Sequence, residues 1–122
     1  NGTGDDLVCD WANDPYRLNY TSTVYNLTLI ISFGNGTNIT FSNTTLTDSY
    51  TSAFDLLRYH AEIKYTCQKM GNRMAYYVSE IDGLSENSQT GNYWRYWING
   101  NYAMVGCNIY VCQDNDIITW EY

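Results

Sequence analysis

The chain has 122 residues, of which 44% are hydrophobic and 16% aromatic, and its formal net charge at pH 7 is −7. A length of this order predicts one domain with a single core. The acidic balance argues against nucleic acid as a partner, because that binding requires clustered Lys and Arg. No apolar run approaches the roughly 20 residues of a membrane-spanning helix. Because no apolar leader precedes Asn1, we expect a mature form.

Residues 1–22 form an arm of mixed character. Leu7, Val8 and Trp11 are apolar, and an Asn-Asp-Pro turn signal follows at residues 13–15. An arm with this apolar content is predicted to dock on a protein surface rather than to remain a solvated tail. It could cover its own domain, or it could add to a sheet of a second copy. The sequence leaves both possibilities open.

Residues 23–33 alternate in the manner of a strand, and a Gly-Asn-Gly turn at residues 34–36 leads into a second strand. We expect these two strands to form a β-hairpin with one buried face. The side chains predicted to point inward are Tyr25, Leu27, Leu29, Ile31, Phe33, Ile39 and Phe41. Those predicted to point outward are Asn26, Thr28, Ser32, Asn38 and Thr40.

N-glycosylation signals of the form Asn-x-Ser/Thr cluster in the arm and in this hairpin. Six occur within the first 45 residues, and none follows. A glycan is bulky and hydrophilic, so each site must lie on the surface. The cluster predicts a secreted, extracellular protein whose outer hairpin carries N-linked glycans. The six sites are Asn1, Asn19, Asn26, Asn35, Asn38 and Asn43.

Residues 51–61 are predicted to form the only helix, with Ser52 and Asp55 as its capping pair. Strands are expected at residues 62–69 and 73–81, then a polar loop at 82–92. An aromatic strand at 93–98, a tight turn at Asn99-Gly100 and a last strand at 117–122 complete the chain. This order defines an α+β fold of the β-grasp kind, a mixed sheet with one helix on one face, preceded by the arm. The domain itself is expected to span residues 23–122.

The four cysteines, Cys9, Cys67, Cys107 and Cys112, are an even number, which in a secreted chain predicts two disulfides. No paired C-x-x-C spacing supports a zinc site, so we expect no metal. Three pairings are possible. We favour Cys9 with Cys67, which would tie down the arm, and Cys107 with Cys112, which would close the loop before the last strand.

Several short motifs in the C-terminal half occur together. They are Ile81-Asp82-Gly83-Leu84, Tyr93-Trp94, Gly106 with Tyr110, and Asp114-Asn115-Asp116-Ile117 closing on Trp120 and Tyr122. Together they resemble the small C-terminal domain of the transcobalamin/intrinsic factor family and its relatives on microbial surfaces. The resemblance extends over about residues 23–122. It implies a β-grasp fold of the soluble-ligand-binding type, which in the vitamin B12 carriers closes over cobalamin.

Catalytic patterns are weak. The single His60 lies on the apolar side of the predicted helix with Ala53, Leu56 and Leu57, and no nucleophile motif accompanies it. We therefore expect a protein that is not an enzyme and that needs no cofactor.

The aromatic strand at residues 93–98 suggests contact with a partner. Tyr93, Arg95 and Trp97 share one face and Trp94, Tyr96 and Ile98 the other, so one set is expected on an open face of the sheet. We expect a structural or adhesive module that self-associates, with filaments as one form of assembly, through Leu7, Val8 and Trp11 of the arm and this sheet surface. The alternative is a module that holds cobalamin, or another flat ligand, against Trp94, Trp97 and Tyr110.

Overall fold

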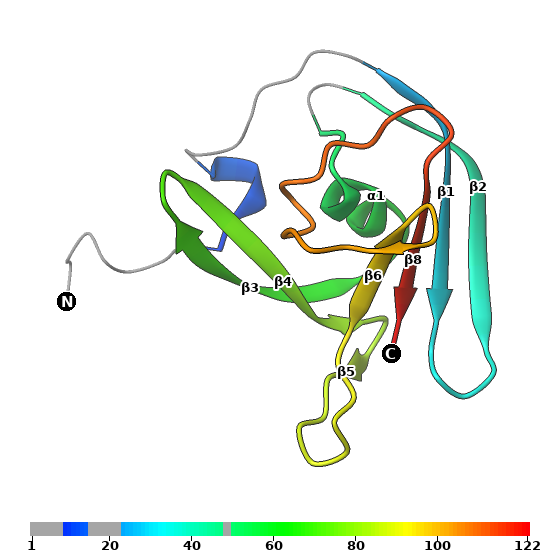
Figure 1. Ribbon diagram of the computed structural model, residues 1–122, viewed down its shortest axis with the longest axis vertical. Helices are drawn as coiled ribbons and strands as arrows, with labels where there is room; N and C mark the ends of the chain where they lie inside the picture. The colour runs from blue at the N-terminus through cyan, green and yellow to red at the C-terminus, as the bar shows by residue number, and fades with distance from the viewer. Residues whose placement is uncertain (1–8, 15–22, 48–49) are drawn as a thin grey trace.

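A computed structural model describes residues 9–14, 23–47 and 50–122 of the chain (Figure 1). These residues form one short 3₁₀ helix, one α-helix and eight strands in two sheets. The elements are η1 (Trp11–Asn13), β1 (Val24–Ser32), β2 (Asn38–Leu46), α1 (Ala53–His60), β3 (Ile63–Met70), β4 (Arg73–Ile81), β5 (Leu84–Ser85), β6 (Arg95–Ile98), β7 (Asn101–Tyr102) and β8 (Ile117–Glu121).

The larger sheet has five strands in the order β2-β1-β8-β6-β7. Its two central strands, β1 and β8, are parallel, with residues 28–32 beside residues 117–121, and its other pairs are antiparallel. The sheet is therefore mixed. With its single α-helix, the described chain has the α+β fold that the sequence predicts.

The helix α1 lies between the two sheets (Figure 1). Phe54 makes edge-to-face contacts with Tyr65 of β3 and Tyr76 of β4, at centroid distances of 4.9 and 5.0 Å. On the other side His60 stacks on Phe41 of β2 at 4.2 Å. Aromatic contacts of this kind contribute beyond the area that they bury, so α1 joins the sheets into one core.

The predicted capping pair begins the helix. Ser52 Oγ accepts a hydrogen bond from the Asp55 amide at 3.1 Å, and the Asp55 carboxylate accepts one from the Ser52 amide at 3.0 Å. This reciprocal arrangement satisfies two amides that the first turn would otherwise leave unpaired.

The hairpin β1–β2 departs from simple alternation at two bulges. Asn26 and Asn43 have positive φ angles of 58° and 54°, and the register between the strands shifts beside each. A bulge inserts one residue and reverses which side chain faces the core. The prediction for Tyr25 is therefore wrong: it is 56% exposed, and Val24 is buried in its place. Ile39, near the turn of the hairpin, is also exposed rather than inward.

Residues 82–92, which we predicted to be a loop, contain the strand β5. Asp82 and Gly83 both have positive φ, and they make a tight turn that pairs Leu84 with Ile81. Asp-Gly is a strong signal for such a hairpin. β5 pairs antiparallel with the end of β4, and residues 63–85 form a three-stranded sheet, β3-β4-β5, separate from the larger one.

The core combines both sheets and the helix. Its fully buried side chains include Leu27, Leu29 and Ile31 of β1, and Ile118 and Trp120 of β8. Within the part of the chain that the structure describes, no helix has the length and apolar character to cross a membrane.

Candidate functional site

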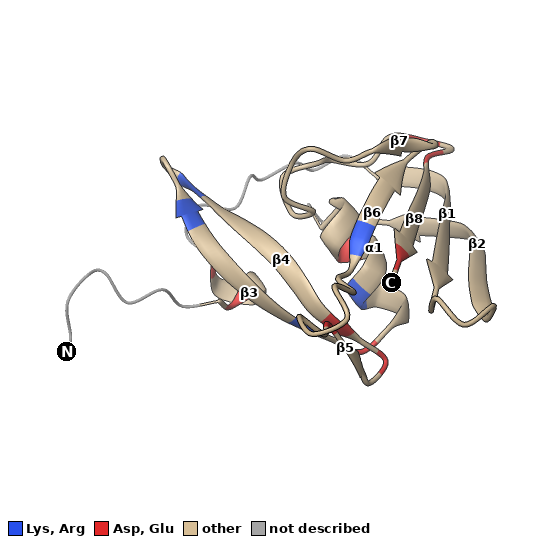
Figure 2. Ribbon diagram, turned by 60° about the horizontal axis from the view of Figure 1, so that its bottom comes forward, with Lys and Arg blue, Asp and Glu red and all other residues tan. Residues whose placement is uncertain are grey.

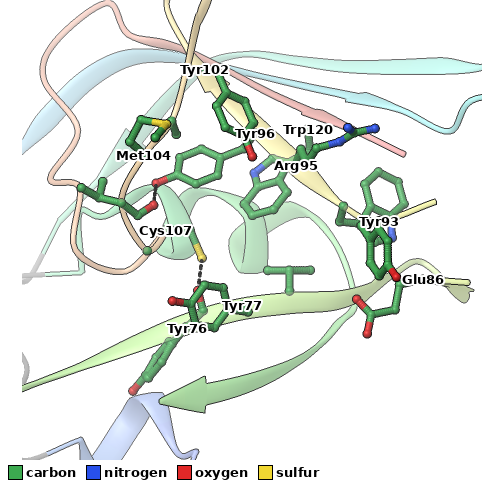
Figure 3. A pocket seen from close by; sticks show the side chains of 15 residues that line it. Tyr76, Tyr77, Glu86, Tyr93, Arg95, Tyr96, Tyr102, Met104, Cys107 and Trp120 are labelled. Atoms are coloured by element: carbon green, nitrogen blue, oxygen red, sulfur yellow. Dashed lines mark hydrogen bonds between the residues drawn. The ribbon is translucent and has the colours of Figure 1, made fainter. Parts of the chain in front are cut away.

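A groove of about 430 Å³ lies between β4 of the smaller sheet and β6 of the larger one (Figure 3). This volume falls within the range of roughly 300–1,000 Å³ that is usual for binding sites in proteins. We call it the inter-sheet groove. Aromatic side chains dominate its lining, and they are Tyr76, Tyr77, Tyr93, Trp94, Tyr96, Tyr102 and Trp120.

Two strand edges border the groove. β4 pairs with β3 along its length but with β5 only at Glu80 and Ile81. β6 pairs with β8 throughout but with β7 only at Trp97 and Ile98. Among the described residues, 73–79 and 95–96 therefore belong to no further strand pair on the groove side, although the Ser79 carbonyl accepts from the Glu86 amide at 2.8 Å and the Tyr96 carbonyl accepts from the Ala103 amide at 3.0 Å. Such edges are potential sites for the addition of another strand.

One end of the groove is closed by the segment that follows β7. The Asn108 side chain donates to the Met74 carbonyl at 2.5 Å and accepts from the Tyr76 amide at 2.9 Å, so it occupies part of the β4 edge. Gly106 allows this close approach, because a Cβ there would lie 3.1 Å from the Ala75 Cβ. Strand addition could therefore begin only beyond Tyr76.

The floor of the groove is an aromatic stack. Tyr96 and Trp120 are parallel at a centroid distance of 4.8 Å, and both are buried. The Tyr96 hydroxyl donates to the Val105 carbonyl at 2.6 Å. The Trp120 indole Nε1 is fully buried, and it has no hydrogen-bond partner among the described residues. An unpaired buried donor is costly, but this nitrogen is not exposed to the groove, so an occupant could reach it only if neighbouring side chains moved.

The rim of the groove is apolar and exposed. Met104 is 84% exposed, and Tyr77, Tyr93, Tyr102 and Val105 are also exposed. Exposed apolar side chains that are grouped around a concave surface usually mark an interaction site. Figure 3 places Arg95, Glu86 and Tyr93 toward one end of the groove and Met104 and Cys107 toward the other.

The base of the arm, residues 9–14, is held on its own domain. Cys9 forms a disulfide with Cys67 of β3, as predicted. The Tyr65 hydroxyl donates to the Cys9 carbonyl at 2.8 Å and accepts from the Trp11 amide at 3.0 Å. The Trp11 ring lies 3.5 Å from the Arg58 guanidinium carbon, a close cation–π contact. We call residues 9–14 the arm base.

Asp14 is the last residue of the arm base and accepts a hydrogen bond from the Tyr76 hydroxyl at 2.6 Å. Burial and the neighbouring Asp14 carboxylate raise the pKa of Tyr76 well above its usual range, so the hydroxyl stays protonated and keeps donating. The arm base is thereby attached to both long strands of the smaller sheet.

A family described as "Domain of unknown function (DUF4430)" matches residues 51–122, more than half of the chain. The chain belongs to this family. The DUF4430 segment contains every residue that lines the inter-sheet groove, whereas the arm and most of the β1–β2 hairpin precede it. No curated protein matches the chain.

Two solved structures share the fold. One is a "putative metal binding protein" from Ruminococcus gnavus ATCC 29149, with a TM-score of 0.63 and 11% identity over 79% of this chain and 93% of that one. The other is haptocorrin in complex with Cbi, with a TM-score of 0.55 and 18% identity over 85% of this chain and 26% of haptocorrin. This chain thus spans about a quarter of haptocorrin. Haptocorrin belongs to the transcobalamin family, so the expected transcobalamin-like fold is confirmed.

The second predicted disulfide is wrong. Cys107 and Cys112 are both buried free thiols, and burial raises the pKa of each well above its usual range. The loop between them passes over the start of α1, where the Cys107 carbonyl accepts from Phe54 and the Cys112 amide donates to Thr51, each at 2.8 Å. Each cysteine is thus attached through its own backbone to the chain at the start of α1.

The three residues proposed for a flat ligand do not share one surface. Trp94 is buried and lines the groove, whereas Trp97 is on the other face of β6 and contacts Tyr102 at 5.4 Å. The Tyr110 hydroxyl donates to Asp116 at 2.6 Å, outside the groove lining. The groove thus retains only Trp94 of this set.

The structure describes only some of the residues that we predicted for self-association and glycosylation. Trp11 packs on its own domain, while Leu7 and Val8 lie outside the described residues. Asn1 and Asn19 also lie outside them. The other four glycosylation signals, at Asn26, Asn35, Asn38 and Asn43, are all exposed on the β1–β2 hairpin. Strands β1 and β8 separate β2 from β6, so most of these sites are remote from the groove.

Sequence reasoning missed the rim of the groove. Tyr102, Met104 and Val105 follow the Asn99-Gly100 turn, in a stretch to which the strand pattern gave no role. Their signal was an apolar run directly after a hairpin turn.

Within the described residues, no group of three His, Cys, Asp or Glu side chains could hold a metal. His60 hydrogen bonds to Thr44 at 2.8 Å, beneath Phe41.

Proposed function

We propose that this chain is an extracellular, N-glycosylated structural module without enzymatic activity. In this proposal copies associate head to tail, and residues 1–8 of one copy occupy the inter-sheet groove of the next. The observation that carries the proposal is the aromatic groove, which is bordered by edges of β4 and β6 that lack a strand partner over part of their length. Strand addition would use main-chain hydrogen bonds for affinity and the aromatic lining for specificity.

The length and composition of the arm support this occupant. Eight extended residues reach about 26 Å, more than enough to lie along the part of the β4 edge beyond Tyr76. Leu7 and Val8 would contribute apolar side chains to the aromatic floor.

The arm base determines which residues are free to act in this way. Cys9 and Trp11 are already attached to β3 and α1 of their own copy, so the donated segment is residues 1–8 alone. Each copy would then have one donated segment and one acceptor groove. A head-to-tail contact of this kind repeats into a closed ring or an open filament.

The positions of the glycans and the disulfide fit an extracellular assembly. N-linked glycans on β2 would lie at the opposite edge of the larger sheet from the groove and would leave the contact unobstructed. The Cys9–Cys67 disulfide is a bond typical of proteins in oxidising compartments. Intact-mass measurement before and after enzymatic deglycosylation tests the glycans directly.

Removal of residues 1–8 tests the proposed assembly. This truncation keeps Cys9 and the arm base, so the domain should remain folded with its disulfide intact. We expect the full chain to form assemblies by light scattering and negative-stain imaging, and the truncated chain to be monomeric. Assembly of the truncated chain at the same concentration would refute the proposal.

A second candidate function is the binding of a flat ligand such as cobalamin. It is supported by the aromatic lining of the groove and by the haptocorrin structure, which contains Cbi. Isothermal titration with cobalamin and with cobinamide tests it. A monomeric chain that binds either ligand at micromolar concentration would favour this candidate over self-association.

A further inference from the structure

The inter-sheet groove has an exposed cation without a partner among the described residues. Arg95 lines the groove and makes no hydrogen bond or ion pair with any residue that the structure describes. Figure 2 shows a basic position on β6, the strand that contains Arg95. By contrast, Arg58 is 2.9 Å from the Asp55 carboxylate, and Lys64 is 3.8 Å from Glu80. Arg95 is thus available to a charge from outside its own domain.

The proposed occupant has acidic residues beside its apolar pair. Asp5 and Asp6 directly precede Leu7 and Val8. In an extended segment, residues two apart share a face at a spacing of about 6.6 Å. If Leu7 or Val8 lies over the Tyr96–Trp120 stack, the aspartate two residues before it therefore lies on the same face, one such spacing further along the groove. Arg95 is adjacent to Tyr96 on β6, and Figure 3 shows it on that side of the stack.

We propose that Arg95 pairs with Asp5 or Asp6 of the neighbouring copy and so sets the register of the donated segment. This inference rests on the proposed function. The net charge of −7 makes two copies repel one another, and a local opposite-charge pair offsets that repulsion at the contact. Glu86 lies toward the same end of the groove. Its carboxylate would repel Asp5 or Asp6 in any register that places one of them beyond Arg95.

Charge exchange between two full-length variants tests this pairing. The first variant is Arg95→Glu with the natural arm, and the second is the double variant Asp5→Lys and Asp6→Lys with the natural groove. Arg73→Glu is the matched control, because it makes the same charge change on β4 at a residue outside the groove lining. Circular dichroism and thermal melting establish that each variant is folded.

We expect each charge variant alone to reach half-assembly only at a concentration at least about tenfold higher than the natural chain, because a pair of opposite charges becomes a pair of like charges. The Arg73→Glu control should assemble at nearly the concentration of the natural chain. An equimolar mixture of the two charge variants should recover assembly, because each arm then meets a groove of opposite charge.

Two results would overturn the pairing. One is assembly of Arg95→Glu at the concentration of the natural chain. The other is a mixture that assembles no better than its components. If truncation of residues 1–8 abolishes assembly while Arg95→Glu does not, the register inference is wrong but the proposed function stands. If neither change has an effect, both are wrong.

Discussion

Removal of the Cys9–Cys67 disulfide by replacing both residues with Ala should destabilise the domain strongly. The bond joins residues 58 apart in the sequence. For a closed loop of this length, the restriction of the unfolded chain is worth about 4 kcal/mol at 25 °C. In the folded state the arm base keeps its contacts to Tyr65, Arg58 and Tyr76, so the effect acts mainly through the unfolded chain.

Urea unfolding followed by circular dichroism measures this change. With a urea dependence of about 2 kcal/mol per M, typical of small domains, the midpoint should fall by about 2 M. Reductant should lower the midpoint of the natural chain to that of the double variant and leave the variant itself unchanged. A loss below about 1 kcal/mol would refute the loop-closure reasoning. A further loss when the variant is reduced would show a bond between Cys107 and Cys112, contrary to the structure.

Three further predictions concern the helix, the single histidine and the rim of the groove. Asp55→Ala removes the capping carboxylate and the ion pair of Arg58, and we expect the free energy of unfolding in urea to fall by about 1–2 kcal/mol. An unchanged midpoint would contradict this. Burial lowers the pKa of His60 below 6.5, so the unfolded chain takes up the proton at a higher pH than the folded chain does. The free energy of unfolding therefore falls as the pH drops below about 6.5. His60→Gln should reduce this loss between pH 7.5 and 5.5, and an identical pH profile would contradict it. Met104→Asp changes an 84% exposed rim position, so it should leave the melting temperature within about 1 °C, because surface changes rarely alter stability. It should nevertheless weaken assembly, and normal assembly would show that this rim is not part of the contact.

Local signals predicted much of the fold. The Ser52–Asp55 capping pair, the boundaries of β4 and the Asn99-Gly100 turn depend on neighbouring residues, so the sequence is sufficient for them. Asn99 and Gly100 both have the positive φ that such a turn requires.

The failures have non-local causes or overlooked turns. Alternation placed Tyr25 in the core because it assumes an unbroken strand, whereas the bulge at Asn26 reverses the face. The Cys107–Cys112 pairing was inferred from proximity in sequence, but both thiols are buried separately by contacts with the start of α1. An Asp82-Gly83 hairpin turn was read as part of a loop.

The candidate site could be predicted only in part. The alternation of residues 93–98 correctly separates the buried Trp94 and Tyr96 from the outward Tyr93 and Arg95. It cannot reveal that β4 and β6 approach one another without pairing, because this depends on how α1 holds the two sheets together. The groove is a product of tertiary packing.

Electron cryomicroscopy of assemblies of the full-length chain tests the central claim most directly. The account predicts an extended segment in the groove between β4 and β6, traceable to Cys9 of the neighbouring copy, with its main chain hydrogen-bonded to the β4 edge beyond Tyr76. A groove that is empty, or that is filled by the same copy's residues 1–8, while the copies touch through other surfaces, would contradict it.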